Sequence, residues 1–326
     1  MGYENIKFPP NTRFLVTGGA GCIGANLVEA LLNKNCFVRV LDNFSTGKQK
    51  NIEPFLKNKN FQFIKGDIRD FNVCNTACYN IDYILHEAAL GSVPKSIKFP
   101  QLYEDVNING TLNIFVAARD NNVKKVVYAS SSSVYGDNYS LPKKEDFIGM
   151  PLSPYALTKR VNELYSSLFS SIYNLQTIGL RYFNVFGKNQ DPDSQYSAVI
   201  PKFIKSFLNG VTPTINGDGH YSRDFTYVEN IIEANLKACI SDESLSGEVF
   251  NIGCGDTITL NKLYSILASS LNFNLPPIYG PTRPGDIPHS NADISKAKKL
   301  LGYSPSYSFE DGIKLTLNWY KKNLYI

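Results

Sequence analysis

Three glycines at a fixed spacing, between an apolar run and a helical pattern, constrain this chain more than any other feature. Residues 14–17 have the composition of a buried β-strand, and residues 22–32 repeat apolar side chains at α-helical spacing. The turn between them carries Gly18, Gly21 and Gly24. Glycine is needed where a backbone turns tightly or approaches a pyrophosphate, and the free N–H groups of the following helix attract phosphate. The pattern therefore predicts a strand–turn–helix unit that binds a phosphate-bearing ligand.

A carboxylate after the second predicted strand narrows the ligand class. Asp42 follows the apolar run 37–41, 18 residues after Gly24. A carboxylate there accepts hydrogen bonds from ribose hydroxyls and repels a 2′-phosphate, which favours NAD over NADP as the cofactor. Asp67 follows the third strand and is placed to reach the adenine. The residues that these segments contribute to the predicted cofactor site are Gly18, Gly21, Cys22, Ile23, Gly24, Asp42, Asn43, Asp67 and Ile68.

Strands and helices alternate through the first half of the chain. Such alternation is typical of a parallel sheet covered by helices on both faces. Right-handed crossovers make such a sheet doubly wound, so the predicted fold class is α/β with a Rossmann-type doubly wound parallel sheet. The predicted strands are 14–17, 37–41, 61–64, 83–85, 126–129 and 177–180, and the clearest helices are 22–32, 106–119 and 156–173.

The second half of the chain differs from the first in composition and pattern. Prolines are frequent after about Gly187, while helical patterns persist at 199–208, 260–271, 295–301 and 309–320. Residues 249–252 form an apolar run that is expected to return to the first sheet. We therefore predict a NAD-binding domain at 1–187, with a return segment near 224–255. The remainder, 188–326, is predicted to be a discontinuous, smaller mixed α/β substrate domain.

Composition excludes several other classes of protein. The net charge is +4 without a Lys/Arg cluster, which argues against nucleic acid as a partner. No run approaches 18 apolar residues, so no membrane span is expected. Six scattered cysteines without a CxxC pair and three isolated histidines argue against disulfides and against a metal site. A cytoplasmic, reducing setting is the expectation.

Hydroxyl and amine groups that suit proton transfer occur at two places. Residues 126–129 lead into four serines, 130–133, at the carboxyl end of a strand, where open α/β sheets bind ligands. Tyr155 and Lys159 are four residues apart and share one face of the predicted helix. A lysine ammonium and a positive nicotinamide should lower the pKa of the phenol toward the working pH. Tyr155 is therefore predicted to be a base for a sugar or alcohol hydroxyl.

Together these segments resemble the extended short-chain dehydrogenase/reductases that act on nucleotide sugars. The resemblance covers nearly the whole chain, and it implies a retained NAD. It rests on the glycine turn, on Tyr155 and Lys159, and on further motifs at 86–89 (HEAA), 107–111, 130–136, 181–187 (RYFNVFG), 223–225 (RDF) and 283–286 (RPGD).

The resemblance also assigns roles to individual residues. It implies that Ala88, Ala89, Asn107, Lys159 and Tyr182 surround the cofactor. It places Asn184, Arg223, Arg283 and Asp286 around a nucleotide diphosphate, a role that suits arginine because guanidinium matches phosphate oxygens. The catalytic group is predicted to be Ser131, Tyr155 and Lys159. Further substrate contacts are expected from Gly91, Ser92, Ser132, Ser133, Val199 and Ser290.

Within this family the serine segment separates the possible reactions. Dehydratases that resemble this chain carry an Asp-Glu pair just before the matching Val-Tyr-Gly, and decarboxylases usually carry a Glu; here Ser132 and Ser133 precede Val134. The absence of a carboxylate at these two positions favours 4-epimerisation. The segments 90–94, 190–192 and 199–201 resemble 4-epimerases of UDP-N-acetylglucosamine and UDP-N-acetylgalactosamine. Ser290 occupies the position at which epimerases restricted to non-acetylated sugars carry a bulky Tyr.

Two other functions and one assembly remain open from the sequence. A UDP-hexuronic acid 4-epimerase, including one for UDP-N-acetylgalactosaminuronate, shares the serine segment and would need a cation near C6, for which Lys188 is a candidate. A non-catalytic NAD-sensing protein usually lacks the Tyr or the Lys, and both are present here. By resemblance a homodimer is expected, built from the helices 106–119 and 156–173 as a four-helix bundle.

Overall fold

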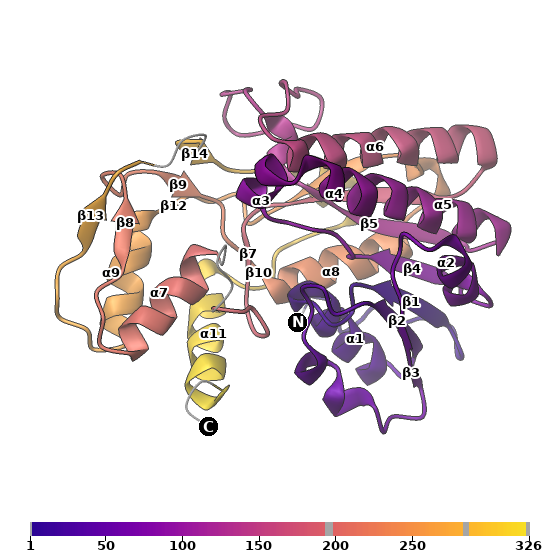
Figure 1. Ribbon diagram of the computed structural model, residues 1–326, viewed down its shortest axis with the longest axis horizontal. Helices are drawn as coiled ribbons and strands as arrows, with labels where there is room; N and C mark the ends of the chain where they lie inside the picture. Colours follow the sequence, from indigo (N-terminus) through magenta and orange to yellow (C-terminus); the bar gives the residue numbers. More distant parts are fainter. Residues whose placement is uncertain (1, 193–197, 283–286, 324–326) are drawn as a thin grey trace.

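Seven parallel strands form the central sheet of the computed structural model, which describes residues 2–192, 198–282 and 287–323 (Figure 1). Across the sheet the order is β11-β6-β5-β4-β1-β2-β3. The predicted α/β, Rossmann-type doubly wound sheet is therefore confirmed. The strands are β1 (Arg13–Thr17), β2 (Phe37–Asp42), β3 (Phe61–Lys65), β4 (Tyr83–His86), β5 (Lys125–Ser131), β6 (Thr177–Tyr182) and β11 (Val249–Ile252).

Helices bury both faces of this sheet. Successive side chains of a strand point to opposite faces, and β1 shows the consequence: Phe14 and Val16 lie in one apolar core, and Leu15 lies in another. The first face is covered by α1 (Cys22–Asn33), α8 (Val228–Cys239) and α10 (Ser295–Leu301). The second is covered by α2 (Phe71–Cys78), α5 (Gly110–Asp120) and α6 (Pro154–Tyr173), with the short α3 (Val93–Lys98) and α4 (Pro100–Glu104) packed against α6.

A smaller second lobe packs around an apolar core of its own. Aromatic rings from two helices meet there, for example Phe203 and Phe207 against Tyr264. Its helices are α7 (Val199–Leu208), α9 (Leu260–Ser270) and α11 (Phe309–Asn323). Its short strands are β7 (Val185–Phe186), β8 (Thr214–Asn216), β9 (Ser222–Arg223), β10 (Thr226–Tyr227), β12 (Ile258–Thr259), β13 (Ile278–Gly280) and β14 (His289–Ser290).

The chain returns from the second lobe to the sheet twice. In the first return, α8 packs on the sheet and β11 pairs with β6, as predicted for residues 249–252. In the second, Ala297 and Leu301 of α10 join the core that covers β11, a return that the sequence pattern did not predict. Within the described ranges, no helix is both long enough and apolar enough to cross a membrane.

The contact between α1 and the turn before it depends on Gly24. A Cβ at this position would lie 2.2 Å from the carbonyl oxygen of Gly18, so we expect Gly24→Ala to lower the free energy of unfolding by about 2 kcal/mol. Gly91→Ala is the matched control, because a Cβ at Gly91 meets no heavy atom within 4 Å. Denaturant unfolding of both variants measures the difference, and equal stability of the two would contradict this account.

Candidate active site

One cavity opens at the topological switch point of the sheet, where the order in which strands are added reverses. From β1 the chain adds β2 and β3 on one side and then crosses to β4 on the other, so the carboxyl ends of β1 and β4 adjoin. Gly18 follows β1 with a φ of 67°, and a Cβ there would lie 2.7 Å from the backbone nitrogen of Ala88, which follows β4. The two strand ends therefore approach so closely that only glycine fits between them.

The first turn of α1 faces this cavity. Gly21 precedes the helix and supplies no side-chain cap, so the first N–H groups are left to a ligand. The cavity brings together most of the residues predicted to hold the cofactor. They are Gly18, Gly21, Cys22, Ile23, Gly24, Asp42, Asn43, Asp67, Ile68, Ala88 and Ala89. Glycine at the close approach, open N–H groups and carboxylates at the ends of neighbouring strands fit a dinucleotide.

Two carboxylates at the far end of the cavity are held in different ways. Asp42 accepts hydrogen bonds from two backbone N–H groups, at 2.9 and 2.7 Å, which fix it at the end of β2. Asp67 accepts from Nε and Nη2 of Arg69, at 3.0 and 2.8 Å. These hydrogen bonds from Arg69 lower the pKa of Asp67 to about 2, so the carboxylate stays ionised as an acceptor. Sequence reasoning did not identify Arg69 as its partner.

The predicted catalytic residues meet at the end of β5. The strand ends at Ser131, and a 3₁₀ turn (η4, Ser132–Tyr135) begins at the next residue. The Ser131 hydroxyl is hydrogen-bonded to Tyr155 and lies 3.0 Å from the hydroxyl of Ser133. Lys159, one helical turn after Tyr155, donates from Nζ to the Ala129 carbonyl on β5 at 2.7 Å. Ser131 is thus placed beside the tyrosine, where its hydroxyl lowers the pKa of the phenol.

Burial has the largest effect on the pKa values of Lys159 and Tyr155. It lowers the pKa of the Lys159 ammonium to about 8, although Glu87 and Glu163 act in the opposite direction. Burial also raises the pKa of the Tyr155 phenol, and only the hydrogen bond with Ser131 lowers it. The sequence predicted that Lys159 and a bound nicotinamide together lower the pKa of Tyr155; in the protein alone Lys159 does not supply that lowering. The reason is that the lysine points its charge at a backbone carbonyl while the phenol is desolvated.

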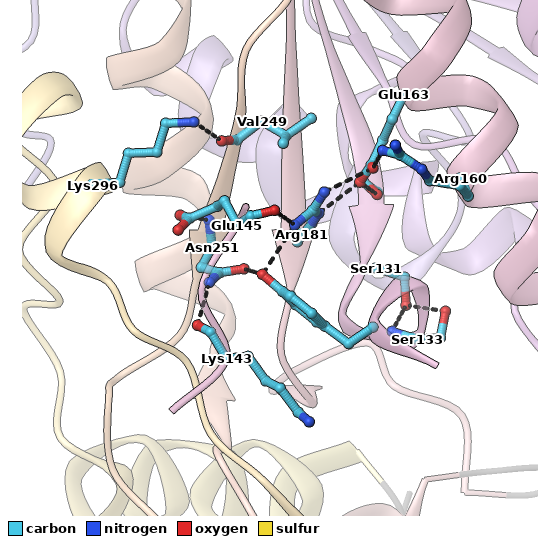
Figure 2. Close-up of polar contacts among 12 residues, drawn as sticks. Ser131, Ser133, Lys143, Glu145, Arg160, Glu163, Arg181, Val249, Asn251 and Lys296 are labelled. Carbon is cyan, nitrogen blue, oxygen red and sulfur yellow. Dashed lines mark hydrogen bonds and ion pairs between the residues drawn. The ribbon is translucent and has the colours of Figure 1, made fainter. Parts of the chain in front are cut away.

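A buried ion pair fixes α6 against the sheet (Figure 2). Arg181 of β6 donates to both carboxylate oxygens of Glu163, at 2.7 Å from Nε and 2.9 Å from Nη2. The two side chains are only 1% and 2% exposed. Glu163 also accepts a hydrogen bond from the Ser130 hydroxyl at 2.6 Å. Because Glu163 lies one turn after Lys159, this pair sets the position of the catalytic helix face.

The same arginine extends the network to the edge of the sheet. Its Nη1 donates to the Tyr135 hydroxyl and to the Glu145 carbonyl, each at 3.0 Å, and Tyr135 donates to Oδ1 of Asn251 on β11 at 2.6 Å (Figure 2). Sequence reasoning assigned none of these residues. The sequence does contain one indication of this network: Glu163, an acidic residue, lies four positions after Lys159 on the same helix face.

Three predicted ligand residues bond mainly to other parts of the protein. Asn107 is fully buried, and its amide accepts from the N–H of Leu90 at 2.8 Å and donates to the Leu90 carbonyl at 3.0 Å. Ser92 caps α3, and Tyr182 donates to Glu87 at 2.7 Å. These contacts support the wall of the cavity, since Leu90 and Glu87 line it.

A second cavity, of about 460 Å³, lies among elements of the second lobe. Asn184, Val199 and Arg223, which are all predicted to contact the substrate, line it. Ser290 on β14 pairs with Arg223 on β9. Gly91 is exposed beside α3, and Arg283 and Asp286 lie outside the described residues. Among the residues that the structure describes, no group of three or more His, Cys, Asp or Glu side chains could hold a metal ion.

Fold and site together define the class of protein. A doubly wound sheet, a glycine turn at its switch point and a Ser-Tyr-Lys group at an adjoining strand end are features of the extended short-chain dehydrogenase/reductases. The chain belongs to the NAD dependent epimerase/dehydratase family, whose model matches residues 14–253. NAD is therefore its cofactor.

Solved structures of related enzymes match almost the whole chain. A UDP-N-acetylglucosamine 4-epimerase from Methanobrevibacter ruminantium M1, in complex with UDP-N-acetylmuramic acid, is 41% identical, with a TM-score of 0.91 over 96% of this chain and 99% of that one. A UDP-glucose 4-epimerase from Thermotoga maritima is 36% identical (TM-score 0.90, 96% and 100%). A UDP-glucuronic acid 4-epimerase from Bacillus cereus, with UDP-glucuronic acid and NAD, is 34% identical (TM-score 0.89, 96% and 100%).

The buried ion pair leads to a prediction about stability. Glu163→Gln leaves the Arg181 guanidinium buried without a counter-charge, so we expect the free energy of unfolding to fall by about 3 kcal/mol. Arg160→Gln is the control, because Arg160 pairs with the same carboxylate at 2.9 Å but is 34% exposed, and its loss should cost about 1 kcal/mol or less. Denaturant unfolding compares the two variants. Similar losses of stability would show that the buried pair with Arg181 contributes no more than the exposed pair with Arg160.

Proposed function

We propose that this chain interconverts UDP-N-acetylglucosamine and UDP-N-acetylgalactosamine by 4-epimerisation. The observation that carries the proposal is the turn beside Tyr155, where Ser132 and Ser133 stand at the place of the acid–base pair of similar dehydratases. With hydroxyls there, removal of water has no acid and base of its own, whereas oxidation and re-reduction at one carbon need only the tyrosine. The likeness to a UDP-N-acetylglucosamine 4-epimerase supports the same substrate.

The residues divide the work of this reaction. Tyr155 takes the proton of the sugar O4, Ser131 relays or holds that proton through its hydrogen bond to the phenol, and Lys159 keeps a positive charge beside them. When bound, NAD supplies the redox chemistry, a reversible uptake of the C4 hydride, and rotation of the 4-keto sugar before its return inverts C4. Gly18, Gly21 and the first turn of α1 would hold the pyrophosphate.

The second cavity is the proposed site of the nucleotide diphosphate. Arg223 and Asn184 line it from two different segments, which suits a ligand with several acceptor oxygens. Ser290 lies next to Arg223 across β9 and β14, so a small side chain there would leave room for a 2-acetamido group. Arg283 and Asp286 complete the proposed site by resemblance.

The contacts of Lys188 weigh against the uronate alternative. Lys188 was the candidate cation for a carboxylate at C6, but its ammonium forms an ion pair with Glu29 on α1. Its backbone carbonyl accepts from the Cys22 thiol at 3.3 Å. The ammonium is therefore already paired with a carboxylate of the protein, which favours the neutral N-acetylhexosamine as substrate. A non-catalytic sensor is disfavoured because Ser131, Tyr155 and Lys159 are assembled.

We propose a homodimer whose interface includes the outer face of α6. Leu157, Leu164, Leu168 and Ile172 follow one another at helical spacing and are 51, 50, 49 and 62% exposed. Such a stripe on a helix is unfavourable in water and suits a second copy of the same face. We also propose the cytoplasm as the compartment, since free thiols such as the six cysteines here persist in reducing surroundings.

Removal of one hydroxyl tests the assigned base. Tyr155→Phe should lower kcat at least about 100-fold, because the sugar O4 proton loses its acceptor. NAD should stay bound, since the cavity walls do not change. Tyr139→Phe, at a site that is 70% exposed, is the control and should match the wild type. Turnover and the cofactor released on denaturation are measured together, and retention of more than a few per cent of activity would remove Tyr155 from this role.

The substrate is tested by a side-by-side assay without added NAD. UDP-N-acetylglucosamine should be epimerised most efficiently among UDP-N-acetylglucosamine, UDP-glucose and their uronates. Ser290→Tyr should lower kcat/KM for the N-acetylated sugar about tenfold or more, because the ring fills the acetamido space, and should affect UDP-glucose less. Ser269→Tyr, exposed on α9, is the control. A preference for a uronate, or equal losses on both sugars, would contradict the proposal.

A further inference from the structure

One carboxyl group in the cofactor cavity has no role in the reaction described above. Glu87 follows β4 directly and lines the cavity beside Ala88, at the topological switch point of the sheet. It lies within the segment 86–89, but no role was assigned to its side chain. Its place between two adjoining strand ends brings it next to any dinucleotide that occupies the cavity.

A chain of hydrogen bonds holds this carboxyl group. Oε1 of Glu87 accepts from the hydroxyl of Tyr182, at the end of β6, at 2.7 Å. The same hydroxyl accepts from Nδ2 of Asn235 on α8 at 2.8 Å, and Nδ2 also donates to the Ile231 carbonyl at 2.9 Å. An ordered donor network of this kind presents the carboxylate at a fixed place, which a solvated surface glutamate does not have.

The charge around the cavity is unevenly distributed. Its described lining contains three carboxylates and no lysine or arginine. Asp42 ends β2 and Asp67 follows β3, whereas Glu87 follows β4, on the other side of β1. The titratable groups that face Glu87 are Lys159 and Tyr155 from α6, Tyr182 from β6 and the neighbouring His86. Glu87 is therefore the carboxylate on the catalytic side of the cofactor.

The ionisation of Glu87 falls in an accessible range of pH. Burial raises its pKa to about 7, while the hydrogen bond from Tyr182 and the charge of Lys159 both lower it. Burial holds the pKa of His86 near 3, so this imidazole stays neutral and does not compete. The pKa of Tyr182 lies well above its ordinary value because of burial and the charge of Glu87. Ionised and neutral Glu87 can thus be compared between about pH 5.5 and 8.5.

We propose that the Glu87 carboxylate biases bound NAD toward its oxidised form. This inference rests on the proposed function, in which Tyr155 takes the O4 proton while the C4–H bond breaks and its two electrons form a C–H bond on the nicotinamide ring. The sugar carbon is oxidised to a ketone, and the ring is reduced from a cation to a neutral group. Because both events involve one carbon, the ring must lie beside Tyr155, which Glu87 faces. A nearby negative charge stabilises the cationic ring and favours return of the hydride.

Chemical reduction without a sugar provides the test. Sodium cyanoborohydride donates a hydride to bound NAD, and absorbance near 340 nm reports the product. We expect Glu87→Gln to be reduced faster than the wild type by about fivefold to tenfold at about pH 8.5, because the amide keeps the acceptor for Tyr182 but not the charge. At about pH 5.5 the two rates should agree within about twofold, since Glu87 is then protonated in the wild type. Glu53→Gln, at an exposed glutamate, is the control and should follow the wild type throughout.

The pH dependence separates an electrostatic role from a structural one. A ratio of rates that stays constant across this range, or a variant that is not reduced faster, would overturn the proposal. Bound NAD is quantified in each preparation. If Glu87→Gln does not retain NAD, the pH profile of the reduction rate is measured for Tyr182→Phe instead. Loss of that hydrogen bond raises the pKa of Glu87, so the midpoint of the pH profile should move upward; an unchanged midpoint overturns the proposal. No sugar takes part, so failure of the proposed epimerisation would appear separately, as absence of turnover by the wild type.

Discussion

The buried pair between Arg181 and Glu163 is the interaction on which the catalytic side of this protein depends. Taking two charges out of water costs several kcal/mol for each ion, and the cost is offset only when both are fully hydrogen-bonded. Here the guanidinium contacts a carboxylate, a phenol and a backbone carbonyl, and the carboxylate accepts from two further donors. One pair thus joins β6, α6, the end of β5 and, through Tyr135, β11. That cluster joins the strand that ends at Ser131 to the helix that carries Tyr155 and Lys159.

In the proposed cofactor site, phosphate binding would rely on the backbone rather than on cationic side chains. The described lining of the cofactor cavity contains no lysine or arginine, so the attraction for a pyrophosphate must come from the open N–H groups and the positive end of α1. Acidic side chains can then be used for recognition on either side without neutralising a cation. The glycine turn is therefore a strong signal in the sequence, because in the proposed site the backbone of the turn itself would bind the phosphates.

The parts of the structure that could be predicted are those with local signals. Buried strands are short apolar runs, Gly18 adopts a φ that favours glycine, and Tyr155 and Lys159 are one helical turn apart. The contacts that position them are not local: Arg181 is 18 residues from Glu163, and Tyr135 is 116 residues from Asn251. Ser92 and Asn107 were predicted to bind ligands. In the protein alone, Ser92 accepts from the N–H of Lys95 and the Asn107 amide bonds to the backbone of Leu90 and to Thr158. Short polar side chains serve both purposes equally well, so their type alone does not separate the two.

The two returns of the chain to the sheet have a consequence for how this enzyme can change. The second lobe, which holds the proposed sugar-nucleotide cavity, is not a terminal module, because β11 and α10 leave it to complete the sheet and its core. Exchange of the whole lobe for another would remove an edge strand and part of the apolar interior with it. A new sugar preference must therefore arise by substitution within short loops and strands such as β9 and β14, while the crossing segments keep both lobes in place.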